Sequence, residues 1–170
     1  MEKSFIAFVE NSIKEHWDLD ALTDYKGATL QYKDVARKIE KLHILLAEDN
    51  ELNMEIAEFM LQNEGADVTK AWNGQEAVEL FEKSRAGEFD VILMDIMMPV
   101  MNGYDATKTI RSLDREDAKE VPIIAMTANA FEEDKRDAIA AGMDGHIAKP
   151  IQVDKLLSML AEMIRQQETH

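Results

Sequence analysis

The chain has 170 residues, 46% of them hydrophobic, and a formal net charge of −15, which suits one ordinary domain with a real core plus a small additional segment. The absence of cysteine excludes disulfides and thiolate metal sites, and the acidic charge argues against binding to nucleic acid phosphates. No apolar stretch approaches the roughly 20 residues of a membrane span, and no signal peptide is recognisable, so we expect a cytoplasmic protein without membrane contact.

The first 43 residues predict a small segment of two helices with a hairpin between them. The helices are expected at about 3–17 and 32–43, and the hairpin turns around Tyr25-Lys26-Gly27. Residues 1–43 carry a net charge of −1, whereas residues 44–170 carry −14. This shift in charge, together with the change in pattern, places the predicted domain boundary after residue 43.

From residue 44 onward, strand and helix patterns alternate five times. Strands are expected at 44–49, 66–71, 90–95, 121–127 and 144–150, and helices at 50–65, 74–87, 103–113, 130–142 and 153–167. Five strand–helix units predict an α/β fold in which a parallel sheet carries helices on both faces. In the first of these helices, the apolar stripe expected to face the sheet consists of Leu52, Ile56, Phe59 and Met60. The charged run at 114–120 is interpreted as a solvated loop.

Polar side chains stand where the predicted strands end. The first strand ends in Glu48-Asp49, the third in Asp95, the fourth in Thr127 and the fifth in Lys149. The carboxyl ends of parallel strands form one rim, where ligands bind in open α/β sheets. Two carboxylates about 4 Å apart repel by roughly 4 kcal/mol at an effective dielectric of 20. A Mg²⁺ ion removes this repulsion and prefers carboxylates, water and phosphate oxygens as ligands, so the rim predicts a magnesium site.

The same residues fit phosphoryl transfer. An aspartate can act as a nucleophile and form an acyl phosphate, which suits Asp95. Lys149 could then pair with one phosphoryl oxygen, and the Thr127 hydroxyl could bond another. Asp49 and Asp95 fit as metal ligands, with Glu48 orienting a water molecule.

Four stretches extend this interpretation: ILLAEDN, VILMDIMMPVMNGYDATKTIR, VPIIAMTANAF and AAGMDGHIAKPI. They resemble the CheY-like receiver domain of two-component response regulators, a flavodoxin-like (βα)5 fold with sheet order 2-1-3-4-5. The resemblance implies phosphorylation of Asp95 from a phosphohistidine donor. It also implies Mg²⁺ bound by Glu48, Asp49, Asp95 and the backbone carbonyl of Met97.

Further roles follow from the same resemblance. Thr127 is implied as the switch hydroxyl, Lys149 as the phosphate-binding lysine, and the bond between Lys149 and Pro150 as cis. His146 stands where the family usually places a rotamer switch, although a packed strand-end histidine explains it equally well. The stretches MTANAF and GMDGHIAKPI are most similar to receivers of hybrid sensor kinases. The expected partner is therefore a histidine kinase or a histidine phosphotransfer protein.

The N-terminal stretch ALTDYKGATLQYKDVARKIEKLH resembles a segment near the start of AMP-forming long-chain acyl-CoA ligases. It lacks a phosphate-binding loop, so we expect neither ligase activity nor ATP binding. The only reactions expected are Mg²⁺-dependent self-phosphorylation and autodephosphorylation. Two alternatives stay open, an inactive ligase fragment and a pseudo-receiver that only binds partners. A unit as small as residues 1–43 rarely folds alone, which predicts a homodimer formed through this segment.

Overall fold

The computed structural model describes residues 42–127, 132–152, 155–156 and 158–159, together with the backbone of residues 20–23 and 29–31. The chain divides into two compact units, Met1–Leu42 and His43–His170, and each is described by itself. Within the described part of the chain, no helix has the length and apolar character needed to cross a membrane.

In the first unit, two short strands form an antiparallel pair. Strand β1 (Asp20–Thr23) lies beside β2 (Thr29–Gln31), with Leu22 opposite Leu30. This pairing confirms that the chain reverses direction between them, as the expected hairpin requires. The helix expected at 3–17 and residues 32–41 of the helix expected at 32–43 lie outside the described residues.

The second unit contains a five-stranded parallel sheet whose order is β4-β3-β5-β6-β7. Counted from β3, this order is 2-1-3-4-5, which confirms the flavodoxin-like fold. Strand β3 begins at His43, which was expected to end the preceding helix, because this residue pairs with Asp67 in the neighbouring strand. The strands are β3 (His43–Ala47), β4 (Asp67–Ala71), β5 (Val91–Asp95), β6 (Ile123–Thr127) and β7 (Gly145–Ala148).

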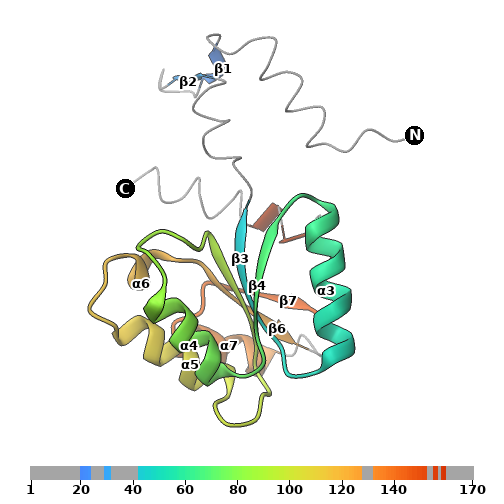
Figure 1. The fold of residues 1–170 in the computed structure, drawn as a ribbon. Coiled ribbons are helices and arrows are strands. Elements are labelled where there is room, and N and C mark those ends of the chain that lie inside the picture. The colour runs from blue at the N-terminus through green and yellow to red at the C-terminus, as the bar shows by residue number, and fades with distance from the viewer. Residues whose placement is uncertain are drawn as a thin grey trace. The chain divides into compact units, whose positions relative to one another are not determined.

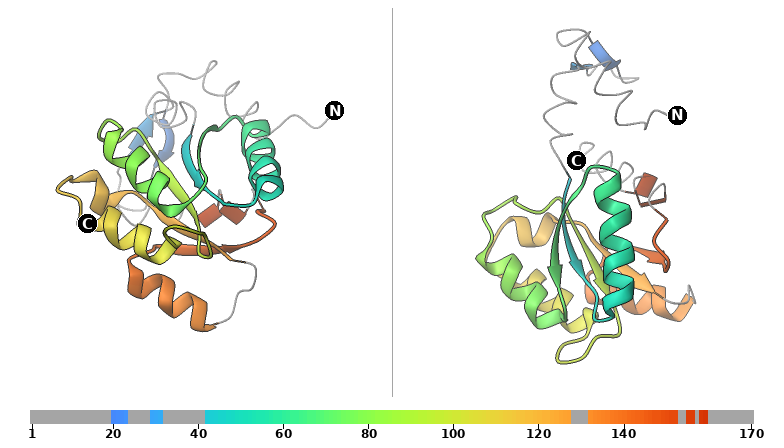
Figure 2. Two further views of the ribbon diagram at one scale, coloured as in Figure 1. Left: turned by 60° about the horizontal axis from the view of Figure 1, so that its bottom comes forward. Right: turned by 45° about the vertical axis from the view of Figure 1, so that its right-hand side comes forward.

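Helices cover both faces of this sheet. Figures 1 and 2 show α4 and α5 side by side on one face, with α3 on the other. Residues 155–156 and 158–159 are helical, as expected for the last helix, and the rest of that helix lies outside the described residues. The helices are α3 (Glu51–Asn63), α4 (Gly74–Lys83), α5 (Gly103–Ser112), α6 (Asp117–Glu120) and α7 (Glu132–Ala141).

The core follows the alternation of side chains along the strands. Leu45 and Ile92 belong to one buried cluster with Phe81 of α4 and Ile110 of α5. Ile44 lies one position from Leu45 and is also fully buried, so it points to the opposite face, which α3 covers. The central strands β3 and β5 are therefore apolar on both faces, and the polar groups of the site stand at the strand ends.

The predicted inward stripe of α3 is wrong. The side chains that face the core are Met54, Ala57 and Leu61. The expected residues are exposed instead: the exposed fraction is 64% for Leu52, 44% for Ile56 and 72% for Phe59, and Met60 is half-buried. Both sets have helical spacing, so periodicity alone does not choose between them. The buried face carries the small Ala57 between Met54 and Leu61, and the large Phe59 lies on the exposed face.

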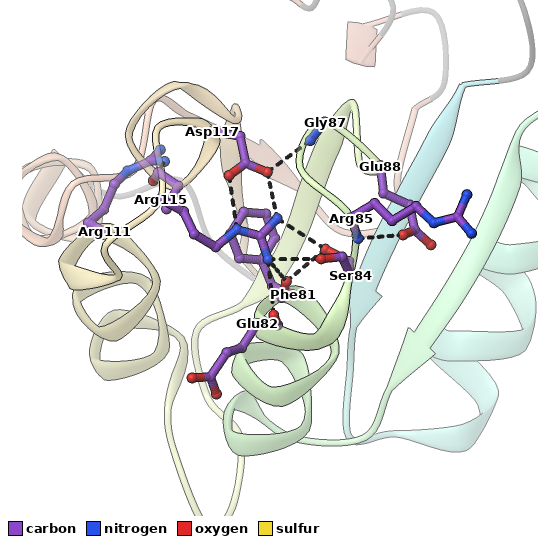
Figure 3. A network of polar contacts seen from close by, with 10 residues as sticks. Phe81, Glu82, Ser84, Arg85, Gly87, Glu88, Arg111, Arg115 and Asp117 are labelled. Carbon is purple, nitrogen blue, oxygen red and sulfur yellow. Dashed lines mark hydrogen bonds and ion pairs between the residues drawn. The ribbon is translucent and has the colours of Figure 1, made fainter.

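The charged run at 114–120 is also not a solvated loop. It contains helix α6 and Arg115, whose Nη1 donates to the carbonyl oxygens of Phe81 at 2.5 Å and Ser84 at 3.1 Å (Figure 3). The guanidinium also lies 4.7 Å from the ring centre of Phe81 and binds Asp117, which accepts a bond from the Gly87 amide at 2.9 Å. The Phe81 carbonyl also accepts from the Ser84 amide at 3.2 Å and from the Ser84 hydroxyl at 2.7 Å, so Arg115 adds to the bonds that close the end of α4.

Candidate functional site

Three carboxylates meet at the carboxyl edge of the sheet. Glu48 and Asp49 follow β3, and Asp95 is the last residue of the adjacent strand β5. One oxygen from each of the three lies within 4.8 Å of the others. Glu48 and Asp95 are buried, whereas Asp49 is exposed. The strand order thus brings these predicted residues together, and it leaves one of them open to solvent.

Lys149 joins this cluster from the end of β7. Its Nζ lies 2.5 Å from Glu48 Oε2 and 2.7 Å from Asp95 Oδ2, and its side chain is 20% exposed. Its backbone amide donates to the Thr127 carbonyl at 2.8 Å, which fixes the start of the loop. The peptide bond between Lys149 and Pro150 is cis, as expected. A single ammonium group is therefore shared by two buried carboxylates.

Burial sets the electrostatics of this ion-pair cluster. Burial raises the pKa of Asp95, and the negative charge of Glu48 raises it further, against the lowering effects of Lys149 and the Met97 amide. Burial alone would lower the pKa of Lys149, but its hydrogen bonds to Asp95 and Glu48 and their charges outweigh this, so the net pKa is raised. Lys149 thus stays an ammonium, while Asp95 is a carboxylate with less favourable solvation than usual.

Two asparagines that the sequence did not single out hold Glu48. Its Oε1 accepts bonds from Asn53 Nδ2 at 3.1 Å and from the Asn50 amide at 3.3 Å. Asn50 also caps α3, because its Oδ1 accepts from the Asn53 amide at 3.0 Å. An asparagine directly before an amphipathic helical pattern is the signal that predicts such a cap. These bonds occupy one oxygen of Glu48 and leave the other to Lys149.

The loop of residues 96–102 follows Asp95 directly. The Met97 amide donates to Asp95 Oδ1 at 3.4 Å, and the Met97 side chain is 80% exposed. At the base of the loop, the Gly103 amide donates to the Ile96 carbonyl at 2.9 Å. The structure thus places the Met97 backbone beside Asp95, and the assignment of its carbonyl as a metal ligand stays a prediction.

Thr127 and His146 lie on the two strands beyond β5. Thr127 ends β6 and is buried, and its neighbour Met126 pairs with Asp95 across the sheet. His146 lies within β7, is half-buried, and pairs with Ala125. Thr127 thus stands at a strand end, where the sequence places it, and the roles of Thr127 and His146 as switch residues stay predictions.

Comparison with known families identifies the class of protein that this fold and site define. The model of the response regulator receiver domain matches residues 44–161. The chain belongs to this family. The match begins at residue 44, so the resemblance of the first 43 residues to acyl-CoA ligases stays a prediction.

Similar proteins and solved structures also belong to histidine kinase and response regulator systems. Histidine kinase 1 of Arabidopsis thaliana is 32% identical over 92% of this chain, and the chain spans 15% of that protein. The magnesium-bound receiver domain of a Pseudomonas aeruginosa PAO1 sensor histidine kinase is 41% identical, with a TM-score of 0.64 over 73% of this chain and 98% of that one. In that structure the magnesium ion is coordinated in the active site cleft.

A further similar structure is a complex. It contains the Saccharomyces cerevisiae histidine phosphotransfer signaling protein and the receiver domain of its downstream response regulator. The match is 30% identical with a TM-score of 0.63, and it covers 75% of this chain and 91% of that chain.

Proposed function

We propose that Asp95 is the phosphoacceptor of a phosphorelay and that Lys149 prepares it for the transfer. A carboxylate oxygen of Asp95 attacks the phosphorus of a phosphohistidine, the new P–O bond forms, and the P–N bond breaks. The electron pair of that bond stays on the imidazole nitrogen, which then takes a proton from solvent. The observation that carries this proposal is the buried Asp95 carboxylate bonded to Lys149 Nζ at 2.7 Å.

Lys149 already lies beside the Asp95 oxygen, where the negative charge of a phosphoryl group would be added. Its ammonium now binds Glu48 and Asp95, and a phosphoryl group on Asp95 would offer it a further anionic oxygen. We propose that the Thr127 hydroxyl moves towards the phosphoryl group and binds another of its oxygens. This movement of Thr127 would change the space available to His146. Differential contact of Thr127 and His146 with the two forms would then shift the population of states.

The acidic cluster fits a magnesium ion. Three carboxylates with oxygens within 4.8 Å of one another carry three negative charges, and Lys149 offsets only one. Oxygen ligands of this kind are those that Mg²⁺ prefers, and the exposed Asp49 leaves one side for water and phosphate. We propose that Glu48, Asp49, Asp95 and the Met97 carbonyl hold the ion. When bound, it supplies neutralisation of the phosphoryl charge.

We propose that a histidine phosphotransfer protein or a histidine kinase docks on α3. A donor histidine must reach Asp95, so its protein must cover this edge of the sheet. Leu52, Ile56 and Phe59 form an exposed apolar stripe on α3. A pocket of about 50 Å³ connects this stripe to the acidic site, because its lining includes both Ile56 and Lys149. An apolar helical surface on the donor protein would complement the stripe.

Acetyl phosphate tests the proposed chemistry without a partner. With Mg²⁺, the mass of the full chain should rise by one phosphoryl group located on Asp95, and Asp95→Asn should abolish the gain. Asp90→Asn is the matched control, because Asp90 is exposed and precedes β5 at its other end. Equal labelling of Asp95→Asn would refute the assignment, and an unlabelled wild type under acetyl phosphate and phosphoramidate would favour the pseudo-receiver.

We also propose, from the apolar composition of residues 1–43, that the chain self-associates through this segment. Light scattering at micromolar concentration should give a dimer for the full chain and a monomer for a chain that starts at Lys41. A monomeric full chain would contradict this proposal.

A further inference from the structure

The loop of residues 96–102 is fastened at two points, and one of them lies on a different helix. Its own end is held by the bond from the Gly103 amide to the Ile96 carbonyl. The second bond comes from helix α4, which begins at Gly74. The Gly74 amide donates to the Met101 carbonyl at 3.0 Å. Met97 lies between these two points, so its position beside Asp95 depends on both.

Gly74 leaves no room for a side chain. A Cβ atom at this position would lie 2.5 Å from the Met101 carbonyl oxygen and 2.9 Å from the Cβ of Ala106. Such distances are well inside the optimal separation of about 3.5–4.0 Å between non-bonded atoms. The start of α4 can therefore approach the loop this closely only because residue 74 is glycine.

The same loop contains a strained residue. Val100 has a φ of 67°, a left-handed conformation that is unfavourable for a β-branched side chain. Residues in such regions are strained and persist when the surroundings hold them. The Val100 side chain is 85% exposed, so packing does little to hold it. The Met101 amide donates to the Pro99 carbonyl at 2.7 Å across Val100, and the adjacent bond from the Gly74 amide to the Met101 carbonyl at 3.0 Å fixes this turn to α4.

We infer that Gly74 is a positioning residue for the phosphoacceptor site, acting through Met101 and the loop of residues 96–102 on the Met97 backbone. This inference rests on the proposed function. To reach even 3.0 Å, a methyl group at Gly74 would have to move the Met101 carbonyl by about 0.5 Å. Mg²⁺ demands ligand distances of about 2.0–2.1 Å and near-ideal geometry, so a shift of this size matters.

The loop, rather than α4, should take up this displacement. Helix α4 buries Ala77, Val78 and Phe81, and its first turn is capped by Asn73, whose Oδ1 accepts from the Glu76 amide at 2.9 Å. The loop exposes Met97 and Val100 to solvent. Moving the helix would disturb the core, whereas moving the loop disturbs mainly the site.

The test compares Gly74→Ala with Gly142→Ala in the full chain. Gly142 has a φ of 96°, and an added Cβ would lie 3.3 Å from Arg111 Cγ, so this control also destabilises the fold. It follows α7 and precedes β7, at the edge of the sheet opposite the acidic site. Two quantities are measured by NMR: the Mg²⁺ dissociation constant, and amide hydrogen exchange of Met97 and Gly103 without metal.

For Gly74→Ala we expect an increase in the Mg²⁺ dissociation constant of about tenfold, typical of a lost supporting contact, and faster exchange at both amides. Gly142→Ala should change neither. If Gly74→Ala does not fold, Gly74→Ala/Ala106→Gly removes the contact at 2.9 Å, keeps the one at 2.5 Å, and should show the same changes. Constants within twofold of wild type, or an equal loss in Gly142→Ala, would overturn the inference. A wild type that binds no Mg²⁺ would instead refute the proposed function.

Discussion

The ammonium of Lys149 lies 2.7 Å from Asp95 Oδ2, although burial raises the pKa of that carboxyl. The contact does not neutralise the site, because Lys149 also binds Glu48 at 2.5 Å. The metal-free protein therefore holds more negative than positive charge in the largely buried cluster of Lys149 and the carboxylates. This excess of negative charge should affect both stability and metal binding.

Removing the cation should expose the repulsion between the carboxylates. Lys149→Gln leaves Glu48 and Asp95 without their shared partner, and loss of one member of a buried ion pair costs about 3 kcal/mol or more. We expect a loss of about 3 kcal/mol in the free energy of unfolding, measured with urea in EDTA at pH 7. Mg²⁺ should restore part of it by binding the folded state. The exposed Lys155 gives the control Lys155→Gln, and equal stability of the two variants would argue against this account.

The raised pKa of Asp95 predicts how stability depends on pH without metal. The folded state binds this proton more tightly than the unfolded state, so the contribution of Asp95 is most favourable below its ordinary pKa. It is lost as pH rises through the raised value. Asp95→Asn removes that loss, so the variant should be more stable than wild type at pH 7, by about 1 kcal/mol. The difference should shrink towards pH 4. Urea unfolding in EDTA at both values measures it, and a difference that grows in acid would contradict the sign.

The exposed stripe on α3 should matter for a protein donor and not for a small one. Phe59→Ser removes a side chain that is 72% exposed, so the fold should be unaffected. Phosphotransfer from a phosphorylated histidine phosphotransfer protein should slow about tenfold, as expected for an apolar anchor worth roughly 1.4 kcal/mol. Labelling by acetyl phosphate should not change.

Ile139→Ser is the matched control for this prediction. Ile139 is 70% exposed on α7, and its neighbour Ala138 belongs to the buried cluster on the α4 and α5 face of the sheet. If Phe59→Ser and Ile139→Ser slow transfer equally, or if neither does, α3 is not the docking surface.

Val100 offers a direct measure of strain beside the site. Asparagine tolerates the left-handed region far better than valine, so Val100→Asn should raise the free energy of unfolding by about 1 kcal/mol. Val100→Thr is the control, because threonine is polar but keeps the β-branch. Thermal or urea unfolding without metal compares the two, and an equal gain in both would attribute the effect to polarity at an exposed position.

Much of this arrangement could be predicted from the sequence, because it depends on local signals. Apolar runs that end in Asp95, Thr127 and Lys149 indicate buried strands with polar ends, and parallel strands bring such ends together. The face of α3 could not be predicted, since Met54 and Ile56 both belong to stripes with helical spacing. Which stripe faces the sheet depends on tertiary packing, which the spacing does not encode.

Contacts between residues far apart in the sequence could not be predicted from the sequence either. The role of Gly74 depends on the Met101 carbonyl, which lies on another helix–strand unit. The bonds of Arg115 to Phe81 and Ser84 join positions more than 30 residues apart, and no spacing in the charged run predicts them. Composition suggested that these charges are solvated, whereas Arg115 binds carbonyls at and after the end of α4.

The Arg115 network lies at the edge of the sheet where the strands begin, because α4 ends there and β5 starts shortly afterwards. Its bonds depend on a guanidinium that stays charged at any accessible pH, and Arg115 holds the pKa of Asp117 below its usual range. Neither a metal ion nor a phosphoryl group at Asp95 changes these charges. We therefore expect this edge to keep its position when the acidic site is occupied. Gly87 itself has a φ of 72°, which disfavours a side chain, so a probe attached at the exposed Glu88 beside it could serve to measure displacements at the opposite rim.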